Sequence, residues 1–156
     1  MINFYIPFRL FTRGFTLVEL LVVIALLAIL ATIAIPNFAT LIANNRATAA
    51  ANDLLGAMFL ARSEAVKLNN PMVITPNGGN WAAGWSITRN DVPVRTRGAL
   101  ARVTIAAEPA FISFGPAGNA NPPAFTFTVT AIGGGNPSRC VSVIASGNAT
   151  AGPCPE

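Results

Sequence analysis

The chain contains no histidine and few charged side chains, and both shortages limit its chemistry. Charged residues make up 10% of 156 positions, and only six of them are carboxylates. Without histidine, the Ser-His-Asp, Cys-His and histidine-metal arrangements of many enzymes are excluded. The carboxylates are scattered and form no close acidic cluster of the calcium-loop type. The sequence therefore predicts a protein that is not an enzyme and that holds no cofactor or metal.

Apolar residues, by contrast, crowd into the first third of the chain. From Leu20 to Ile35 there is no charge, and a helix of this length spans about 24 Å, close to the hydrocarbon thickness once Leu17 and Val18 are added. The run predicts a membrane-spanning helix. Glu19 stands at its start, and insertion scales give a bare charge at the centre of a membrane helix a cost of roughly 2.5 to 3.5 kcal/mol. This residue therefore needs a partner.

Basic residues flank the run on one side. Arg9 and Arg13 precede it, and the next Lys or Arg is Arg46. Because positive flanks stay in the cytoplasm, we expect the remainder of the chain to be extracytoplasmic. Cys140 and Cys154 then lie in an oxidising compartment, where we expect them to form a disulfide. Two buried free thiols are the alternative.

Three interpretations compete for residues 1–36. A cleaved secretory signal fits poorly, because the run ends in Ile33-Ala34-Ile35-Pro36 and the nearest small-x-small site, Ala47-Thr48-Ala49, lies far downstream. A plain signal anchor explains the hydrophobicity but leaves Glu19 unexplained. In the third interpretation every residue has a role, because Gly14-Phe15-Thr16-Leu17-Val18-Glu19 closely resembles the processing motif of the type IV pilin family.

In that family, a prepilin peptidase cuts after the glycine and methylates the new N-terminal amine. The resemblance implies cleavage between Gly14 and Phe15, N-methylation of Phe15, and a leader of residues 1–14. It also makes Glu19 an assembly residue, since the glutamate at this place pairs with the N-terminal amine of a neighbouring subunit. The implied partners are the prepilin peptidase, other pilin or pseudopilin subunits and, before assembly, the bacterial inner membrane.

Pro36 ends the apolar run, at a place where this family commonly carries a proline. Proline lacks the N–H for a helical hydrogen bond and costs about 3 kcal/mol in a helix interior. We expect a kink or local melting there, which makes Pro36 a second assembly residue. The alternative is that the helix stops at Pro36 and another begins at Asn37.

Residues 37–70 are expected to form an amphipathic helix, because apolar residues recur at spacings of three and four. The helix should end at Asn69-Asn70-Pro71, since the residue before a proline avoids helical geometry. Its apolar stripe must be buried by residues further along the chain. The stripe consists of Ala51, Leu54, Met58, Ala61, Ala65 and Leu68, broadened by Leu55 and Val66.

Residues 71–156 read as a β-rich head, with short β-prone runs between Gly, Pro and Asn. The expected fold class is α+β, a pilin fold in which a long N-terminal helix packs on an antiparallel β-sheet head. Residues 15–36 form the transmembrane and assembly half of this helix, and residues 37–70 form its amphipathic half. Strands are expected at 72–75, 85–88, 102–105, 111–114, 124–130 and 139–144.

Part of the head adds a narrower resemblance. Residues 61–67, Ala-Arg-Ser-Glu-Ala-Val-Lys, together with Pro71-Met72-Val73-Ile74 and Gly84-Trp85, are similar to the GspH/FimT-type minor pilins and pseudopilins. The similarity implies a low-copy subunit near the tip of a type IV pilus or a type II secretion pseudopilus, with its C-terminal domain in the periplasm. Two questions stay open here: whether Arg62 and Glu64 form a solvated helix end or pack on the sheet, and whether Trp81 and Trp85 are core or rim residues or form a ligand platform.

DNA is the alternative partner. Four arginines gather within fourteen residues and could hold phosphates if they share a face, or they could be scattered over a loop and a strand. FimT-like members that bind DNA in natural transformation carry Gly-Arg-x-Arg near the C-terminus. Here that region reads Gly147-Asn148-Ala149-Thr150, without either arginine, which favours a FimU-like structural role. The four candidates are Arg89, Arg95, Arg97 and Arg102.

Overall fold

The computed structural model describes residues 14–107 and 109–155. These belong to two compact units, one ending at Ile35 and the other beginning at Pro36. The charges expected to orient the leader, Arg9 and Arg13, lie outside the described residues.

Helix α1 spans Leu17–Leu68 and is the only helix among the described residues that is long and apolar enough to cross a membrane. Its best 18-residue window has a mean hydropathy of 2.9, and none of that window is buried. The helix continues through Pro36, so the alternative in which it ends there is wrong. A bend or local melting at Pro36 stays a prediction.

The C-terminal end of α1 lies where the sequence predicts it. Asn69 adopts a left-handed φ of 49°, and the backbone N–H groups of Asn69 and Asn70 donate to the carbonyls of Val66 and Ala65. These two bonds form a Schellman motif, which satisfies carbonyls that the helix leaves unpaired. Pro71 follows and prevents the helix from continuing.

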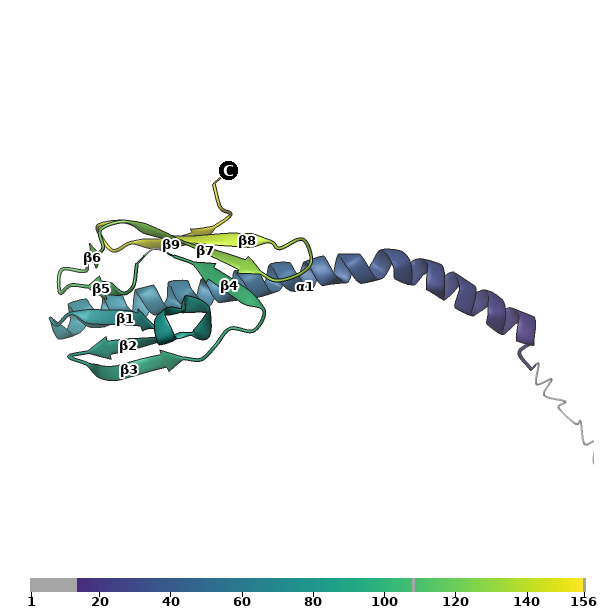
Figure 1. Cartoon of the computed structure of the whole chain (residues 1–156), viewed down its shortest axis with the longest axis horizontal. Coiled ribbons are helices and arrows are strands. Elements are labelled where there is room, and N and C mark those ends of the chain that lie inside the picture. The colour runs from purple at the N-terminus through teal and green to yellow at the C-terminus, as the bar shows by residue number, and fades with distance from the viewer. Residues whose placement is uncertain (1–13, 108, 156) are drawn as a thin grey trace, which may run out of the picture. The chain divides into compact units, whose positions relative to one another are not determined.

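The strands of the head form two sheets, and all their pairings are antiparallel. Sheet A has the order β3-β2-β1-β5-β6, and sheet B has the order β4-β7-β8-β9. Both pack on the C-terminal part of α1 and share one core with it (Figure 1). The strands are β1 Met72–Pro76, β2 Trp85–Arg89, β3 Val92–Arg97, β4 Val103–Ala106, β5 Ile112–Phe114, β6 Ala120–Asn121, β7 Phe125–Ala131, β8 Ser138–Val143 and β9 Ala149–Gly152.

The α+β prediction is confirmed, and each expected strand matches an observed one to within one residue at either end. Three strands were not predicted. All six residues of β3 are exposed, so no alternation of buried and exposed positions marks it. Strand β6 has two residues, and β9 is built from small residues of low β propensity.

The core lies between α1 and both sheets. The predicted stripe is buried from Ala51 to Ala65, but Leu68 and Val66 are 39% and 51% exposed, so their assignment to the stripe is wrong. The buried row instead begins earlier, at Ala43, and ends before the last turn of the helix. Its many alanines leave room for large side chains from the sheets, among them Trp85, Phe114 and Phe127.

Both tryptophans are buried in this core, so neither offers an exposed ring as a ligand platform. Trp81 belongs to a short 3₁₀ turn, Trp81–Ala83, that follows another at Asn77–Gly79. Its indole Nε1 donates to the Pro109 carbonyl at 3.1 Å, so the buried N–H is satisfied. The Trp81 ring meets Phe127 edge to face, with 4.8 Å between the centroids. This contact joins the turn before β2 to sheet B.

Candidate functional site

The predicted processing site immediately precedes α1. Gly14 and Phe15 are both exposed. A Cβ added to Gly14 would meet no heavy atom within 4 Å. The packing of the described residues therefore gives no reason for glycine at this position.

Glu19 lies in the first turn of α1, three residues after the capping residue Thr16. The Thr16 hydroxyl accepts a hydrogen bond from the Glu19 backbone N–H at 3.2 Å. Together they have the spacing of a capping box, in which a threonine and a glutamate satisfy the first turn of a helix. Among the described residues, the Glu19 carboxylate takes part in neither a hydrogen bond nor an ion pair.

The position of Glu19 at the helix N-terminus offsets only part of the free-energy cost of placing its charge in a membrane. A carboxylate near a helix N-terminus gains about 0.3 to 1 kcal/mol from the helix dipole. At the centre of a membrane helix, the insertion cost of a charged side chain is roughly 2.5 to 3.5 kcal/mol. Since the first value is smaller, the helix alone would not make this carboxylate tolerable at that depth.

Two of the four candidate arginines lie together on β3. Arg95 and Arg97 are opposite Ile87 and Trp85 on β2. Facing residues of an antiparallel pair share one side of the sheet, so both arginines lie on the side that faces α1. Arg97 donates two hydrogen bonds to the Asp53 carboxylate of α1, from Nη2 at 2.6 Å and from Nε at 3.1 Å.

The other two candidates lie elsewhere. Arg89 is at the far end of β2, opposite Val92. Arg102 precedes β4 with a left-handed φ of 56°, and its Nη2 lies 3.3 Å from the place of a Cβ on Gly133. The structure thus brings Arg95 and Arg97 together in a groove between α1 and β3, and neither Arg89 nor Arg102 lines this groove.

Arg62 packs into the head, which answers one of the open questions. Its Nε donates to the Gly118 carbonyl at 3.0 Å, and its Nη2 donates to the Ser146 carbonyl at 3.1 Å. These carbonyls belong to the loops after β5 and after β8. Glu64 is different, since it faces the exposed Lys67 at 3.7 Å as a solvated pair.

The loop that holds Gly147 is closely packed. Gly147 has a φ of 75°, and a Cβ there would collide with the Gly118 carbonyl oxygen. Arg62 lies against the same position. The segment that carries Gly-Arg-x-Arg in DNA-binding FimT-like members therefore begins here at a structural contact.

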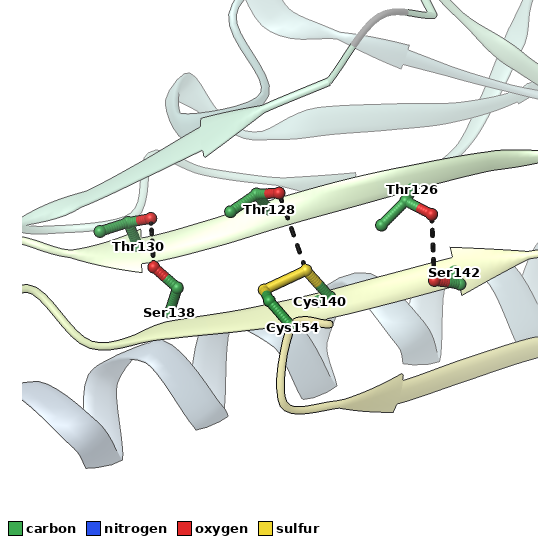
Figure 2. Close-up of a disulfide and its surroundings, with 7 residues drawn as sticks. All are labelled: Thr126, Thr128, Thr130, Ser138, Cys140, Ser142 and Cys154. Carbon is green, nitrogen blue, oxygen red and sulfur yellow. Dashed lines mark hydrogen bonds between the residues drawn. A yellow bond between two sulfur atoms is a disulfide. The ribbon is translucent and has the colours of Figure 1, made fainter. Parts of the chain in front are cut away.

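Cys140 and Cys154 form a disulfide, as predicted, so the free-thiol alternative is wrong. Figure 2 shows Cys140 in a row of side chains between β7 and β8. Cys140 faces Thr128, and hydroxyl pairs lie on either side of it. These pairs are Thr126 with Ser142 at 3.0 Å and Thr130 with Ser138 at 2.8 Å. The disulfide attaches the segment after β9 to this face of sheet B.

The described residues offer no sign of a metal centre. Over residues 14–107 and 109–155, no three His, Cys, Asp or Glu side chains come close enough to hold an ion. What the geometry does show is a largely exposed apolar helix segment, an acidic residue in its first turn, and a β head with one disulfide.

This combination defines a pilin-like class of protein, and two solved structures show the same fold. Both are crystal structures of the type IV minor pilin FimU from Pseudomonas aeruginosa strain PAO1. One has a TM-score of 0.62 and 24% identity, covering 70% of this chain and 90% of its own. The other has a TM-score of 0.59 and 24% identity, covering 68% and 92%.

Residues 50–147 match the family model of the type II transport protein GspH, and residues 11–35 match the prokaryotic N-terminal methylation motif. The chain therefore belongs to the GspH family of pilin-like proteins. Proteins of this kind are structural subunits rather than enzymes. No curated protein matches the chain in sequence.

Proposed function

We propose that the protein is a low-copy subunit near the tip of a type IV pilus or a type II secretion pseudopilus. One observation carries this proposal: Glu19 begins an exposed apolar helix and finds no partner among the described residues. A cation from another subunit would neutralise the carboxylate, whereas a solitary anchored chain would leave it unpaired in lipid.

The cation is the N-terminal amine of a neighbouring subunit. Cleavage between Gly14 and Phe15 by the prepilin peptidase creates this amine, and methylation leaves it positively charged. An ammonium–carboxylate pair of this kind forms a charge-assisted hydrogen bond in a low-dielectric environment. Glu19 would thereby select processed subunits, because an uncut neighbour has no amine at the required position.

The openness around Gly14 supports the processing step. Since a Cβ there would meet nothing in the described structure, a requirement for glycine would come from the peptidase. A residue without a side chain gives an enzyme close access to the backbone. Leader residues 1–13 lie outside the described part of the chain.

The segments then take separate roles. Residues 15–36 hold the chain in the inner membrane as a single span and later pack among other subunits. Residues 37–70 lie under the head, and residues 71–156 present it in the periplasm. Pro36 marks the junction, and we expect a bend or local melting there during assembly because its turn lacks one backbone hydrogen bond.

Of the two filaments, the disulfide favours the type IV pilus. A disulfide attaches the end of the chain to sheet B, and such a bond stabilises a domain mainly by restricting its unfolded state. A subunit carried outside the cell has more need of this protection than one that stays in the periplasm.

Mass spectrometry of purified filaments tests the proposal. We expect a chain that begins at N-methylated Phe15 to be present at low abundance beside the major subunit. If the chain is instead found only in the membrane fraction, uncut and unmethylated, the proposed function is wrong. Parallel isolation of pili and secretion pseudopili distinguishes the two filaments.

DNA uptake is the second candidate function, and the shared groove position of Arg95 and Arg97 is the observation in its favour. Against it, Arg97 is already paired with Asp53. The fragment 37–156 suits a binding assay, since all buried residues in the described structure lie between Ala43 and Ala149. Titration of this fragment with duplex DNA at low and moderate salt tests for DNA binding, because phosphate binding weakens steeply as salt rises. An absence of binding at low salt removes this function.

A further inference from the structure

A groove of about 510 Å³ runs between α1 and the edge strand β3. Trp85 and Ile87 lie at its base and are almost fully buried. Basic side chains from β3 form one wall, and the other wall is formed by α1, which contributes two polar and three small or apolar residues. The complete lining is Asn52, Asp53, Gly56, Ala57, Leu60, Trp85, Ile87, Arg95 and Arg97.

Gly56 leaves this groove open. It lies inside α1, where glycine costs about 1 kcal/mol relative to alanine. A Cβ at this position would meet no heavy atom within 4 Å. Packing within the described structure therefore does not require glycine, and the missing side chain leaves space in which another chain can place one.

The groove carries one positive charge that no carboxylate of the described residues pairs with. Arg97 is neutralised by Asp53, at 2.6 Å between Nη2 and Oδ2. Arg95 lines the same groove, and it forms no ion pair with any carboxylate in the described ranges. A carboxylate is the group that complements a guanidinium best, through paired N–H donors.

Strand β3 adds an open backbone edge. It is the outer strand of sheet A and pairs only with β2 in the described structure. Pro93 and a bulge beside Val94 interrupt its first half, but residues 95–97 keep a regular register with β2. The regular part of the edge is thus the part that borders the groove. Open strand edges of this kind accept extended segments of other chains.

We propose that the groove receives an extended acidic segment from a neighbouring filament subunit. The segment would pair with the edge at residues 95–97, place a carboxylate on Arg95 and place an apolar side chain over Gly56. The inference rests on the proposed function, because the neighbour is another subunit of the filament. Nucleic acid fits less well, since it carries a negative charge on every nucleotide and Asp53 also lines the groove, whereas the segment needs a single carboxylate at Arg95.

Site-specific photo-crosslinking in the native cells tests this proposal. A benzoylphenylalanine replaces Asn52, an exposed groove residue, and a matched chain carries it at Phe59, an exposed position of α1 outside the groove. We expect the Asn52 probe to join a filament subunit at a peptide that contains Asp or Glu. The Phe59 probe should not join that peptide.

Two variants connect the crosslink to the groove. Gly56→Leu fills the space and improves helix propensity, so the fragment 37–156 should unfold at an unchanged or higher temperature while the crosslink is lost. Arg95→Gln should reduce the crosslink about fivefold, as expected for one partly screened ion pair. A crosslink that is unaffected by both variants contradicts the proposal, as does a crosslink to nucleic acid alone.

Filament composition separates this inference from the proposed function. If the wild-type chain is absent from purified filaments, both are wrong. If it is present, but the Asn52 probe captures no acidic segment, only the groove proposal is wrong and the subunit assignment stands.

Discussion

The two units of this protein treat apolar side chains in opposite ways. From Leu17 to Ile35, the large apolar side chains of α1 are exposed. In the unit that begins at Pro36, many side chains of the same kinds are buried between the helix and two sheets, although Phe38, Leu41 and Ile42 near its start are exposed. Burial of apolar surface is the main favourable term in folding. The second unit therefore buries much of its apolar surface within the chain. The apolar side chains of the first unit need lipid or other subunits to cover them.

Charged side chains show a related contrast. In the unit that begins at Pro36, Arg62 and Arg97 find partners within the chain, although Arg95 forms no ion pair in the described ranges. Glu19 finds none among the described residues, although it lies in the part of the chain where an unpaired charge costs most. Substitutions in the first unit should consequently affect assembly, whereas substitutions in the core of the second unit should affect stability.

The largest effect is expected at Gly14. Gly14→Val should block cleavage and filament entry, because a branched side chain obstructs the peptidase at the cleaved bond. Gly98→Val is the control, since Gly98 also has no neighbour within 4 Å of an added Cβ. Mass spectrometry of the cellular protein gives the result. A mature mass for Gly14→Val would show that this glycine is not part of the processing site.

Glu19→Ala should have the second largest effect. We expect cleavage to stay largely intact and filament incorporation to fall at least about tenfold, since the alignment with a neighbour's amine is lost. Glu64→Ala removes a carboxylate that pairs only with exposed Lys67, so it should incorporate normally. Immunoblots of sheared filaments measure both variants. Equal incorporation of Glu19→Ala and wild type would exclude the pairing role.

Replacing both Cys140 and Cys154 with serine should lower the stability of the second unit without affecting processing. The disulfide closes a loop with a sequence separation of 14, for which the entropic estimate is about 3 kcal/mol. Urea unfolding of fragment 37–156 should show a loss of that size, while processing of the full chain continues. A loss below about 1 kcal/mol would mean that the hydroxyl pairs and the core hold this part of sheet B without the disulfide.

Arg62→Leu should have the smallest of these effects. It removes two hydrogen bonds to loop carbonyls, at an expected cost of about 1 to 3 kcal/mol in the same fragment. Lys67→Ala is the matched control on the same helix, because its side chain is largely exposed, and it should change stability by less than about 0.5 kcal/mol. Equal effects of the two variants would contradict the packing role of Arg62.

Much of the fold could be predicted because local signals agreed with one another. The helix end at Asn69 and Asn70 and the alternation along β7 each have a direct physical cause in the sequence. Strand β3 could not be predicted in this way, since none of its residues is buried. Leu68 was misassigned because helical periodicity shows which residues share a face but not where the covering sheet ends.

In the candidate site, too, some residues have a local sequence signal and others depend on the fold. Gly14 and Glu19 could be selected from the sequence, because an acidic residue in an apolar run is unusual by itself. The groove could not, since it depends on a missing side chain at Gly56 and on Arg95 lying beside α1. The pairing of Arg97 with Asp53 likewise joins residues 44 positions apart. No local pattern reports such a contact.

A filament structure determined by cryo-electron microscopy, with this subunit resolved, would measure the distance from the Glu19 carboxylate to the nearest N-terminal nitrogen. We predict a separation of about 2.7 to 2.9 Å to the N-terminal amine of the adjacent subunit, the length of a charge-assisted hydrogen bond. A Glu19 carboxylate that faces no amine and is solvated or paired within its own chain would contradict the assembly role proposed for this residue.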